Sequence, residues 1–137
     1  MFDVYYGDKF TIEFQHFPKN LQDAILDFTD LVEEHGLGAH NKNKGIYKGK
    51  ISHSWRNLDP SDPDYAYTYS NSLWHYHVGI PAYIPSRHGN YYTSDMVLHF
   101  VWKKDETKIL IVDCTEHYNA YGKFWLPRPA YLLQTPP

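Results

Sequence analysis

The sequence contains a single cysteine, Cys114, among its 137 residues. One thiol cannot form an internal disulfide framework or a Cys-x-x-Cys metal knuckle. No apolar run approaches the roughly 18 residues that a membrane span requires. The opening residues also lack the apolar core of a signal peptide. These absences predict a cytoplasmic protein without a membrane segment.

Positive charge is also scarce. The formal net charge is −3, so no bulk positive field draws the chain to nucleic acid, and any polyanion site must be a local patch. The one sustained basic stretch carries four lysines: Lys42, Lys44, Lys48 and Lys50. A charge run of this kind is either a solvated loop or a local phosphate-binding patch, and both interpretations stay open.

Composition places the chain among ordered globular proteins. Hydrophobic residues make up 42% and charged residues 21%, values that exclude a disordered chain. The length and the lack of an internal linker or repeat predict one domain over residues 1–137. Aromatic residues reach 18%, with 13 tyrosines. Such residues pack cores more often than they stack bases, although both roles are possible here.

Hydrophobic periodicity predicts a helix followed by a sheet. Leu21, Ile25 and Phe28 recur at helical spacing, so we expect an amphipathic helix over residues 18–35. Residues 1–17 are β-prone. The later segments predict a short strand at 51–56, a turn-rich loop at 57–65, a strand within 67–80, a long loop at 81–94, and a hairpin of strands 95–102 and 108–114. This order predicts an α+β fold, with an antiparallel or mixed sheet of about four to five strands and the N-terminal helix on one face.

The nine histidines are unevenly placed. His75 and His77 share one face of a predicted strand, His99 lies on the next strand, and His117 directly follows the last one. Because neighbouring strands lie about 4.8 Å apart, these side chains can meet on one surface. Three explanations stay open: a facial set of imidazoles that binds a metal, acid–base catalysis, and histidines with a purely structural role.

The predicted loop at 81–94 carries further candidates. Arg87 can offer a bidentate fork to a phosphate, and Tyr91 and Tyr92 can stack on a base. Asp95 follows the loop, where its carboxylate can orient a histidine or an incoming hydroxyl. The alternative is a solvated loop without a binding role.

Three motifs in the second half of the chain are WHYHVGIP, TSDMVLHFVW and KILIVDCTEHYNAY. Together they resemble bacterial toxins of the RelE superfamily, the YafQ and YafO branches in particular. In that pattern a strand histidine is followed by an aspartate that opens the next strand. A histidine then follows the last strand, with an aromatic residue four positions further on. His75 or His77, Asp95, His117 and Tyr121 match these positions.

The resemblance implies a RelE-like fold and the activity of a small mRNA endonuclease that acts on the translating ribosome. Cleavage would proceed by attack of the ribose 2′-hydroxyl on the adjacent phosphate, without a metal or other cofactor. The implied partners are mRNA, the ribosome, and a cognate antitoxin whose segments cover the active face. No membrane takes part.

The resemblance also implies roles for the matched residues. His117 would be a general acid or base with His75 or His77 as its counterpart. Asp95 would be a base or would orient a histidine, and Tyr121 would stack on the base. The remaining implied positions are Arg87 or Arg56 as phosphate stabiliser, and Lys42, Lys44, Lys48, Lys50, Arg56 and Tyr92 as RNA-binding residues.

Two functions of other classes remain open. A His-rich metal-binding enzyme or binding protein would purify with stoichiometric zinc, iron or nickel. A non-catalytic interaction module with the same fold would keep every activity after alanine replaces His75, His77 and His117.

Overall fold

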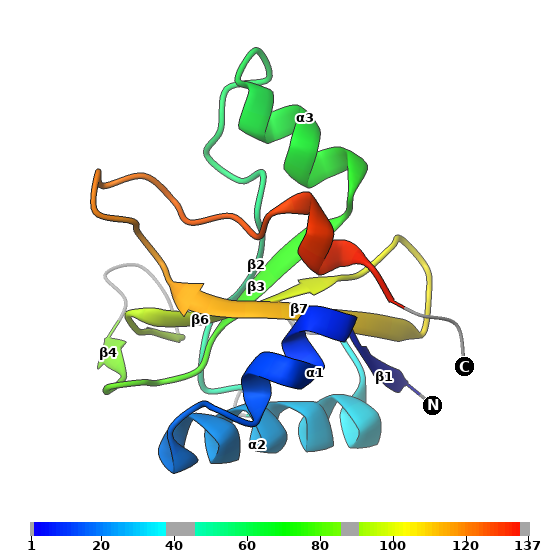
Figure 1. Ribbon diagram of the computed structural model, residues 1–137, viewed down its shortest axis with the longest axis vertical. Helices are drawn as coiled ribbons and strands as arrows, with labels where there is room; N and C mark the ends of the chain where they lie inside the picture. Colours follow the sequence, from blue (N-terminus) through cyan, green and yellow to red (C-terminus); the bar gives the residue numbers. More distant parts are fainter. Residues whose placement is uncertain (1, 38–45, 86–90, 135–137) are drawn as a thin grey trace.

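The computed structural model describes residues 2–37, 46–85 and 91–134. The main strands of this part of the chain are β1 (Asp3–Tyr6), β2 (Ile51–His53), β3 (Leu73–His77), β6 (Met96–Val101) and β7 (Lys108–Glu116). They form one sheet in the order β1-β7-β6-β3-β2 (Figure 1). β1 runs parallel to β7, and the other neighbours are antiparallel, so the sheet is mixed.

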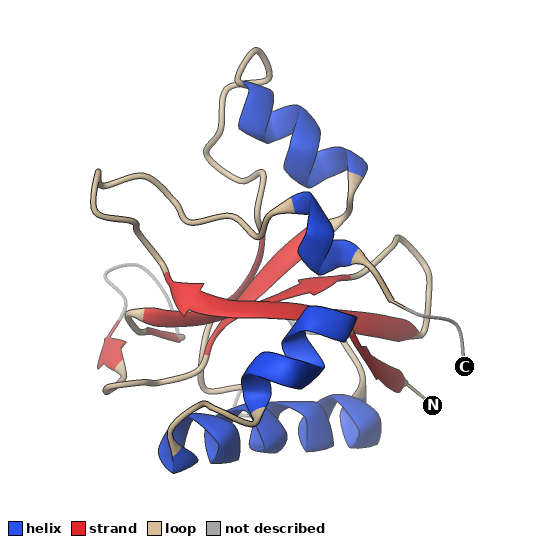
Figure 2. Cartoon of the chain, viewed as in Figure 1, coloured by secondary structure: helices blue, strands red, loops and turns tan. Residues whose placement is uncertain are grey.

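Helices lie on both sides of this sheet. They are α1 (Asp8–Phe14), α2 (Lys19–His35), α3 (Pro63–Ser70) and the 3-10 helix η1 (Pro129–Leu132). In the view of Figure 2, α2 lies below the sheet, while α3 and η1 lie above it. The mixed α/β character and the helix over residues 18–35 are therefore confirmed.

The core fills the space between α2 and the sheet. Leu21, Ile25 and Phe28 recur on one face of α2 and are buried, as their spacing predicts. Phe28 stacks on Tyr76 of β3, with ring centroids 4.2 Å apart, and lies 5.7 Å from Phe100 of β6. Because side chains alternate along a strand, the histidines on either side of Tyr76 lie on the opposite face of the sheet.

The β-prone interpretation of residues 1–17 is only partly correct. β1 ends at Tyr6, and α1 begins directly after Gly7. Phe10 and Phe14 are four residues apart, so a helix brings their rings to one side, where the centroids lie 5.8 Å apart. Burial of Phe10 against the sheet outweighs the β propensity of this aromatic run.

The loop predicted at 57–65 is also corrected, and the strand predicted within 67–80 is shorter than that range. α3 occupies Pro63–Ser70, and β3 starts only at Leu73. The side chain of Asp62 accepts a hydrogen bond from the Asp64 N–H at 2.9 Å, and Pro63 takes the first helical position. Both are standard helix-start features, and they prevail over the strand preference of the tyrosines in α3.

Smaller differences affect the other strands. β2 ends at His53, three residues earlier than expected, because the chain turns there: the Arg56 N–H donates to the His53 carbonyl at 3.2 Å. The loop expected at 81–94 contains a two-stranded sheet of β4 (Ile84–Pro85) and β5 (Tyr92–Thr93). The hairpin of β6 and β7 is confirmed, and β7 runs two residues further than predicted.

Gly49 allows the segment that precedes β2 to pass unusually close to β3. A Cβ atom at this position would lie 1.9 Å from the His77 carbonyl oxygen and 2.9 Å from a ring carbon of Tyr76. The neighbouring Lys50 accepts the His77 N–H at 3.1 Å and donates to the Tyr92 carbonyl at 2.9 Å. A side chain at Gly49 would therefore push apart the segments that position His77.

We expect Gly49→Ala to lower the free energy of unfolding by about 3 kcal/mol, because the Cβ meets rigid backbone in a packed site. Gly122→Ala is the comparison, since nothing lies within 4 Å of its Cβ and only its φ of +76° opposes a side chain. That strain costs about 1–2 kcal/mol. Urea unfolding followed by circular dichroism measures both variants. Equal losses would contradict the close approach at Gly49.

Candidate functional site

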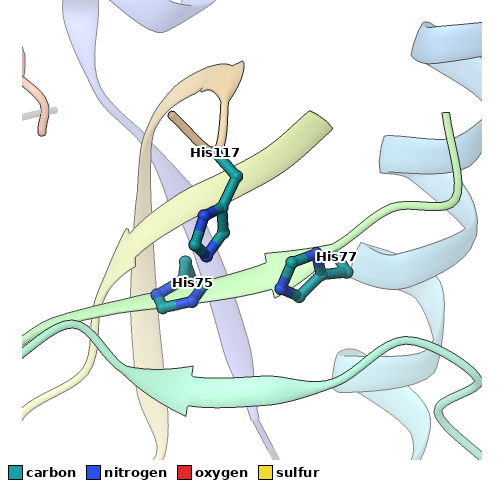
Figure 3. Close-up of side chains that lie close together, drawn as sticks. All are labelled: His75, His77 and His117. Atoms are coloured by element: carbon teal, nitrogen blue, oxygen red, sulfur yellow. The ribbon is translucent and has the colours of Figure 1, made fainter. Parts of the chain in front are cut away.

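Three imidazoles converge on the face of the sheet opposite α2, and we call His75, His77 and His117 the histidine cluster. His75 and His77 project from β3, and His117 reaches them from the end of β7 (Figure 3). One ring nitrogen of each lies within 4.8 Å of those of the others. The predicted convergence of these three histidines is therefore present in the fold.

Main-chain bonds fix the segment that carries His117. Its N–H donates to the Asp95 carbonyl at 2.6 Å, and its carbonyl accepts the Trp125 N–H at 3.0 Å. The chain then turns back, so that Phe124 packs against both His75 and His117, with ring centroids 4.8 and 4.9 Å apart. The C-terminal segment thus crosses the histidine face and holds the imidazoles in place.

Hydrogen bonds orient the two strand histidines. The Nδ1 atom of His75 lies 3.0 Å from the Ser54 hydroxyl. The Nδ1 atom of His77 lies 2.9 Å from both the carbonyl oxygen and the amide nitrogen of Ser94. Nδ1 of His117 is buried and has no hydrogen-bond partner among the described residues. The first two rings are therefore anchored through Nδ1, which leaves Nε2 for chemistry.

His99 has a different environment. Its side chain is fully buried, and its Nε2 atom lies 2.8 Å from the Thr115 hydroxyl. Its ring centroid lies 6.5 Å from that of His75 and 5.8 Å from that of Phe124. Because His99 is covered by the histidine cluster and Phe124, it supports the site from below and does not face solvent.

A cleft of about 560 Å³ opens over the histidine cluster. Lys50 and Arg56 line it with positive charge, and Asp95 lines it with an exposed carboxylate. Tyr118 forms an aromatic wall, and its ring centroid lies 4.3 Å from that of His117. The cleft therefore combines proton-transfer groups with cationic groups, the combination that phosphate chemistry needs.

Burial changes the protonation of the imidazoles. Desolvation, with smaller contributions from neighbouring imidazoles and Lys50, lowers the pKa of His117 to about 4 and that of His75 well below its usual value. Burial likewise lowers the pKa of His77, and it lowers that of His99 to about 3. The rings are therefore neutral at pH 7, the form in which imidazole accepts a proton or binds a metal ion.

The other predicted site residues are divided between the cleft and its surroundings. Arg56, Lys50 and Asp95 line the cleft, whereas Tyr121 does not and is 89% exposed. Tyr92 lies outside the cleft lining, on β5. Three predicted positions lie outside the described residues: Lys42, Lys44 and Arg87.

Lys48 and Tyr92 instead belong to a small aromatic platform beside the cleft. The Nζ atom of Lys48 lies 5.0 Å from the ring centroid of Tyr83 and 5.2 Å from that of Tyr92. The two tyrosine rings are 5.9 Å apart. Partly exposed rings with a cation over them form a surface on which a nucleic-acid base can stack.

Sequence reasoning missed four residues of the site: Ser54, Ser94, Tyr118 and Phe124. Tyr118 directly follows His117, and that adjacency was a usable signal for an aromatic wall. Ser94 directly precedes the predicted strand, but its main-chain contact with His77 has no sequence signature. Ser54 and Phe124 come from segments far along the chain, and only the tertiary fold brings them to the imidazoles.

A second cavity, of about 470 Å³, lies beside α1 and η1 and is lined by Glu13, Asp113, Arg128 and Tyr131. The Tyr131 hydroxyl donates to the Glu13 carboxylate. Asp113 is buried, and desolvation together with the charge of Glu13 raises its pKa to about 6, although the Cys114 N–H donates to it. The ionised form of Asp113 is therefore destabilised in the folded protein.

We expect the free energy of unfolding to fall as pH rises through this shifted pKa. A carboxyl group with a pKa of about 6 when folded and about 3.8 when unfolded stabilises the fold below pH 4, and that stabilisation is lost by about pH 7. The change is on the order of 3 kcal/mol. Asp113→Asn removes it, whereas the exposed Asp30→Asn control retains it. Urea unfolding between pH 4 and pH 7 measures the difference, and parallel pH profiles for wild type and Asp113→Asn would contradict the assignment.

Comparisons of the chain with protein-family models, curated proteins and solved structures found no match. None of the helices in the described ranges combines the length and the apolar character needed to cross a bilayer. The function must therefore be argued from the geometry of the cleft and from the sequence motifs that build it.

Proposed function

We propose that the chain is an endoribonuclease, the toxin of a toxin–antitoxin pair, which cleaves mRNA on the translating ribosome in the cytoplasm. The observation that carries this proposal is the convergence of the histidine cluster at the floor of a cleft lined by Lys50 and Arg56. The motifs that resemble RelE-superfamily toxins supply His75, His77 and His117 themselves. The proposal thus has a chemical basis and a sequence basis in the same residues.

The element order adds support. RelE-superfamily toxins commonly carry two helices near the N-terminus, and α1 and α2 occupy that part of this chain. The strands that carry the motifs, β3, β6 and β7, are adjacent in the sheet. This adjacency brings four of the matched residues, His75, His77, Asp95 and His117, to the same cleft, whereas Tyr121 lies outside it.

In the proposed reaction the ribose 2′-hydroxyl attacks the neighbouring phosphate. His117, the most exposed member of the histidine cluster, accepts the hydroxyl proton through a ring nitrogen. The P–O5′ bond breaks, and the ammonium of Lys50 donates a proton to the departing 5′ oxygen. The products are a 2′,3′-cyclic phosphate and a 5′-hydroxyl end, so atoms and charge balance without a cofactor.

Cationic groups stabilise the pentacovalent phosphorane. Arg56 and Lys50 line the cleft within a chain of net charge −3, so their field acts locally on a phosphate over the imidazoles. His77 is anchored by Ser94, and its ring helps to position the reacting phosphate. The platform of Lys48, Tyr83 and Tyr92 lies next to the cleft and holds a neighbouring base by stacking.

A partner protein is part of the proposal. The cleft is open to solvent and carries both charge and aromatic surface, which an antitoxin segment can cover. A bound antitoxin would block the approach of mRNA to the histidine cluster. We expect the free protein to be the active form.

The proposal is tested with the purified protein, translating ribosomes and an mRNA of defined sequence. Cleavage should give 5′-hydroxyl and 2′,3′-cyclic phosphate ends and persist in EDTA. A single 2′-deoxy nucleotide at the cut site should abolish cleavage there, because the nucleophile is missing. Cleavage of the deoxy substrate at the same position would contradict the mechanism, and intact mRNA in every reaction would contradict the function.

A further inference from the structure

The strand histidines of the cluster have the hydrogen-bond arrangement typical of metal ligands. Nδ1 of His75 faces the Ser54 hydroxyl at 3.0 Å, and Nδ1 of His77 lies 2.9 Å from both the carbonyl oxygen and the amide nitrogen of Ser94. A metal bound at Nε2 selects the tautomer in which Nδ1 carries the proton, and both Nδ1–H groups then have an oxygen to donate to, the Ser54 hydroxyl and the Ser94 carbonyl. In that tautomer both rings place the Nε2 lone pair where it can bind an ion.

His117 supplies the third ligand. Its Nδ1 atom is buried without a partner among the described residues, which is costly for a polar atom unless something binds it. The three ligand atoms lie within 4.8 Å of one another. A tetrahedral ion with nitrogen ligands at about 2.1 Å spaces them roughly 3.4 Å apart, so small ring rotations complete the site.

The donor set indicates which ion fits. Three imidazole nitrogens with no carboxylate among them favour borderline transition metals, such as Zn²⁺ and Ni²⁺, over Mg²⁺ and Ca²⁺, which prefer oxygen. The sheet and Phe124 close the site from below and behind. The fourth position opens to the cleft, where a water molecule or a substrate oxygen completes the coordination.

We propose that His75, His77 and His117 bind one Zn²⁺-class ion through three ring nitrogens. The ion occupies the same imidazoles as the proposed ribonuclease chemistry, but that chemistry uses no metal. If that chemistry holds, the ion inhibits it, because the lone pair of His117 then belongs to the metal and cannot accept the 2′-hydroxyl proton. This inhibitory consequence, unlike the binding site itself, rests on the proposed function.

Binding is measured without RNA. The protein is treated with a chelator, dialysed and titrated with Zn²⁺ by calorimetry, and Co²⁺ is added as a spectroscopic substitute. We expect one ion per chain, the visible absorption bands of four-coordinate Co²⁺, and no competition from a thousandfold excess of Mg²⁺. Binding of several weak ions, or Co²⁺ bands of a purely octahedral ion, would overturn the proposal.

Variants locate the ion. His117→Ala and His117→Gln should each weaken Zn²⁺ binding at least about 100-fold, and Ser54→Ala about tenfold through loss of the support to His75. His16→Ala is the matched control, because His16 is exposed and lies in the connection between α1 and α2, far in sequence from the histidine cluster. Circular dichroism verifies folding. Unchanged affinity in the folded His117 variants would overturn the site.

The outcomes separate the two proposals. A chain that binds Zn²⁺ at the cluster but never cleaves mRNA contradicts the ribonuclease function and leaves the metal site intact. A metal-free chain that cleaves mRNA but binds no ion contradicts the metal site alone. Where both are present, one equivalent of Zn²⁺ should stop cleavage, and excess EDTA should restore it.

Discussion

Replacing His117 with alanine is expected to lower the rate of mRNA cleavage by about 10²–10⁴-fold, the usual contribution of one positioned acid–base group. The imidazole is the most exposed of the histidine cluster and lines the same cleft as Lys50 and Arg56. Its loss removes the acceptor of the 2′-hydroxyl proton and leaves the fold in place, because His117 follows the end of β7. Single-turnover cleavage of a defined mRNA measures the effect.

Two controls make this result specific. His16→Ala removes an exposed imidazole away from the cleft and should cleave at the wild-type rate. Lys50→Ala should also slow cleavage, because it removes both charge and the proposed proton donor, whereas Lys50→Arg should restore only the charge-dependent part. A folded His117→Ala variant that cleaves as fast as wild type would remove His117 from the mechanism.

The second large effect concerns stability. Phe28→Ala should lower the free energy of unfolding by about 3–5 kcal/mol, since it empties a buried aromatic site. The Phe28 side chain is 1% exposed and contacts Tyr76, Phe100 and Tyr47. Tyr76 lies between His75 and His77 on β3. The aromatic residues around Phe28 therefore support the strand that carries the site. Urea unfolding followed by circular dichroism measures the loss.

Two further substitutions test whether the loss of stability comes from the buried volume of Phe28. Phe28→Leu keeps most of the volume and should cost less than about 1.5 kcal/mol. Leu26 lies on the same helix, but its side chain is 42% exposed. Leu26→Ala should therefore lower the free energy of unfolding much less than Phe28→Ala. Equal costs for Phe28→Ala and Leu26→Ala would place the core elsewhere.

Long periodic segments could be predicted from the sequence. The helix α2 buries one face, and its apolar residues recur at helical spacing. The strands β6 and β7 are buried on both faces over most of their length, so they read as continuous apolar runs. The alternation around Tyr76 likewise placed His75 and His77 on one face. Because the register of β3 against β6 is fixed by its buried residues, this part of the site was also predictable.

The short helices could not be predicted in the same way. In α1 and α3, phenylalanines and tyrosines favour strands locally, but tertiary burial of Phe10 and the Asp62 cap decide for a helix. The contacts of Phe124 and Ser54 with the histidine cluster depend on chain segments far apart in sequence. No local pattern records such contacts, so the walls of the cleft emerge only from the fold.

The most direct test of the central claim is to express the chain and its His117→Ala variant in a bacterium that lacks the antitoxin, and to map new transcript 5′ ends. We expect growth arrest with wild type, together with new in-frame cuts within coding regions that carry 5′-hydroxyl ends. Both should be absent with the folded variant. If the wild-type protein accumulates in folded form and neither slows growth nor cuts any transcript, the ribonuclease function is wrong.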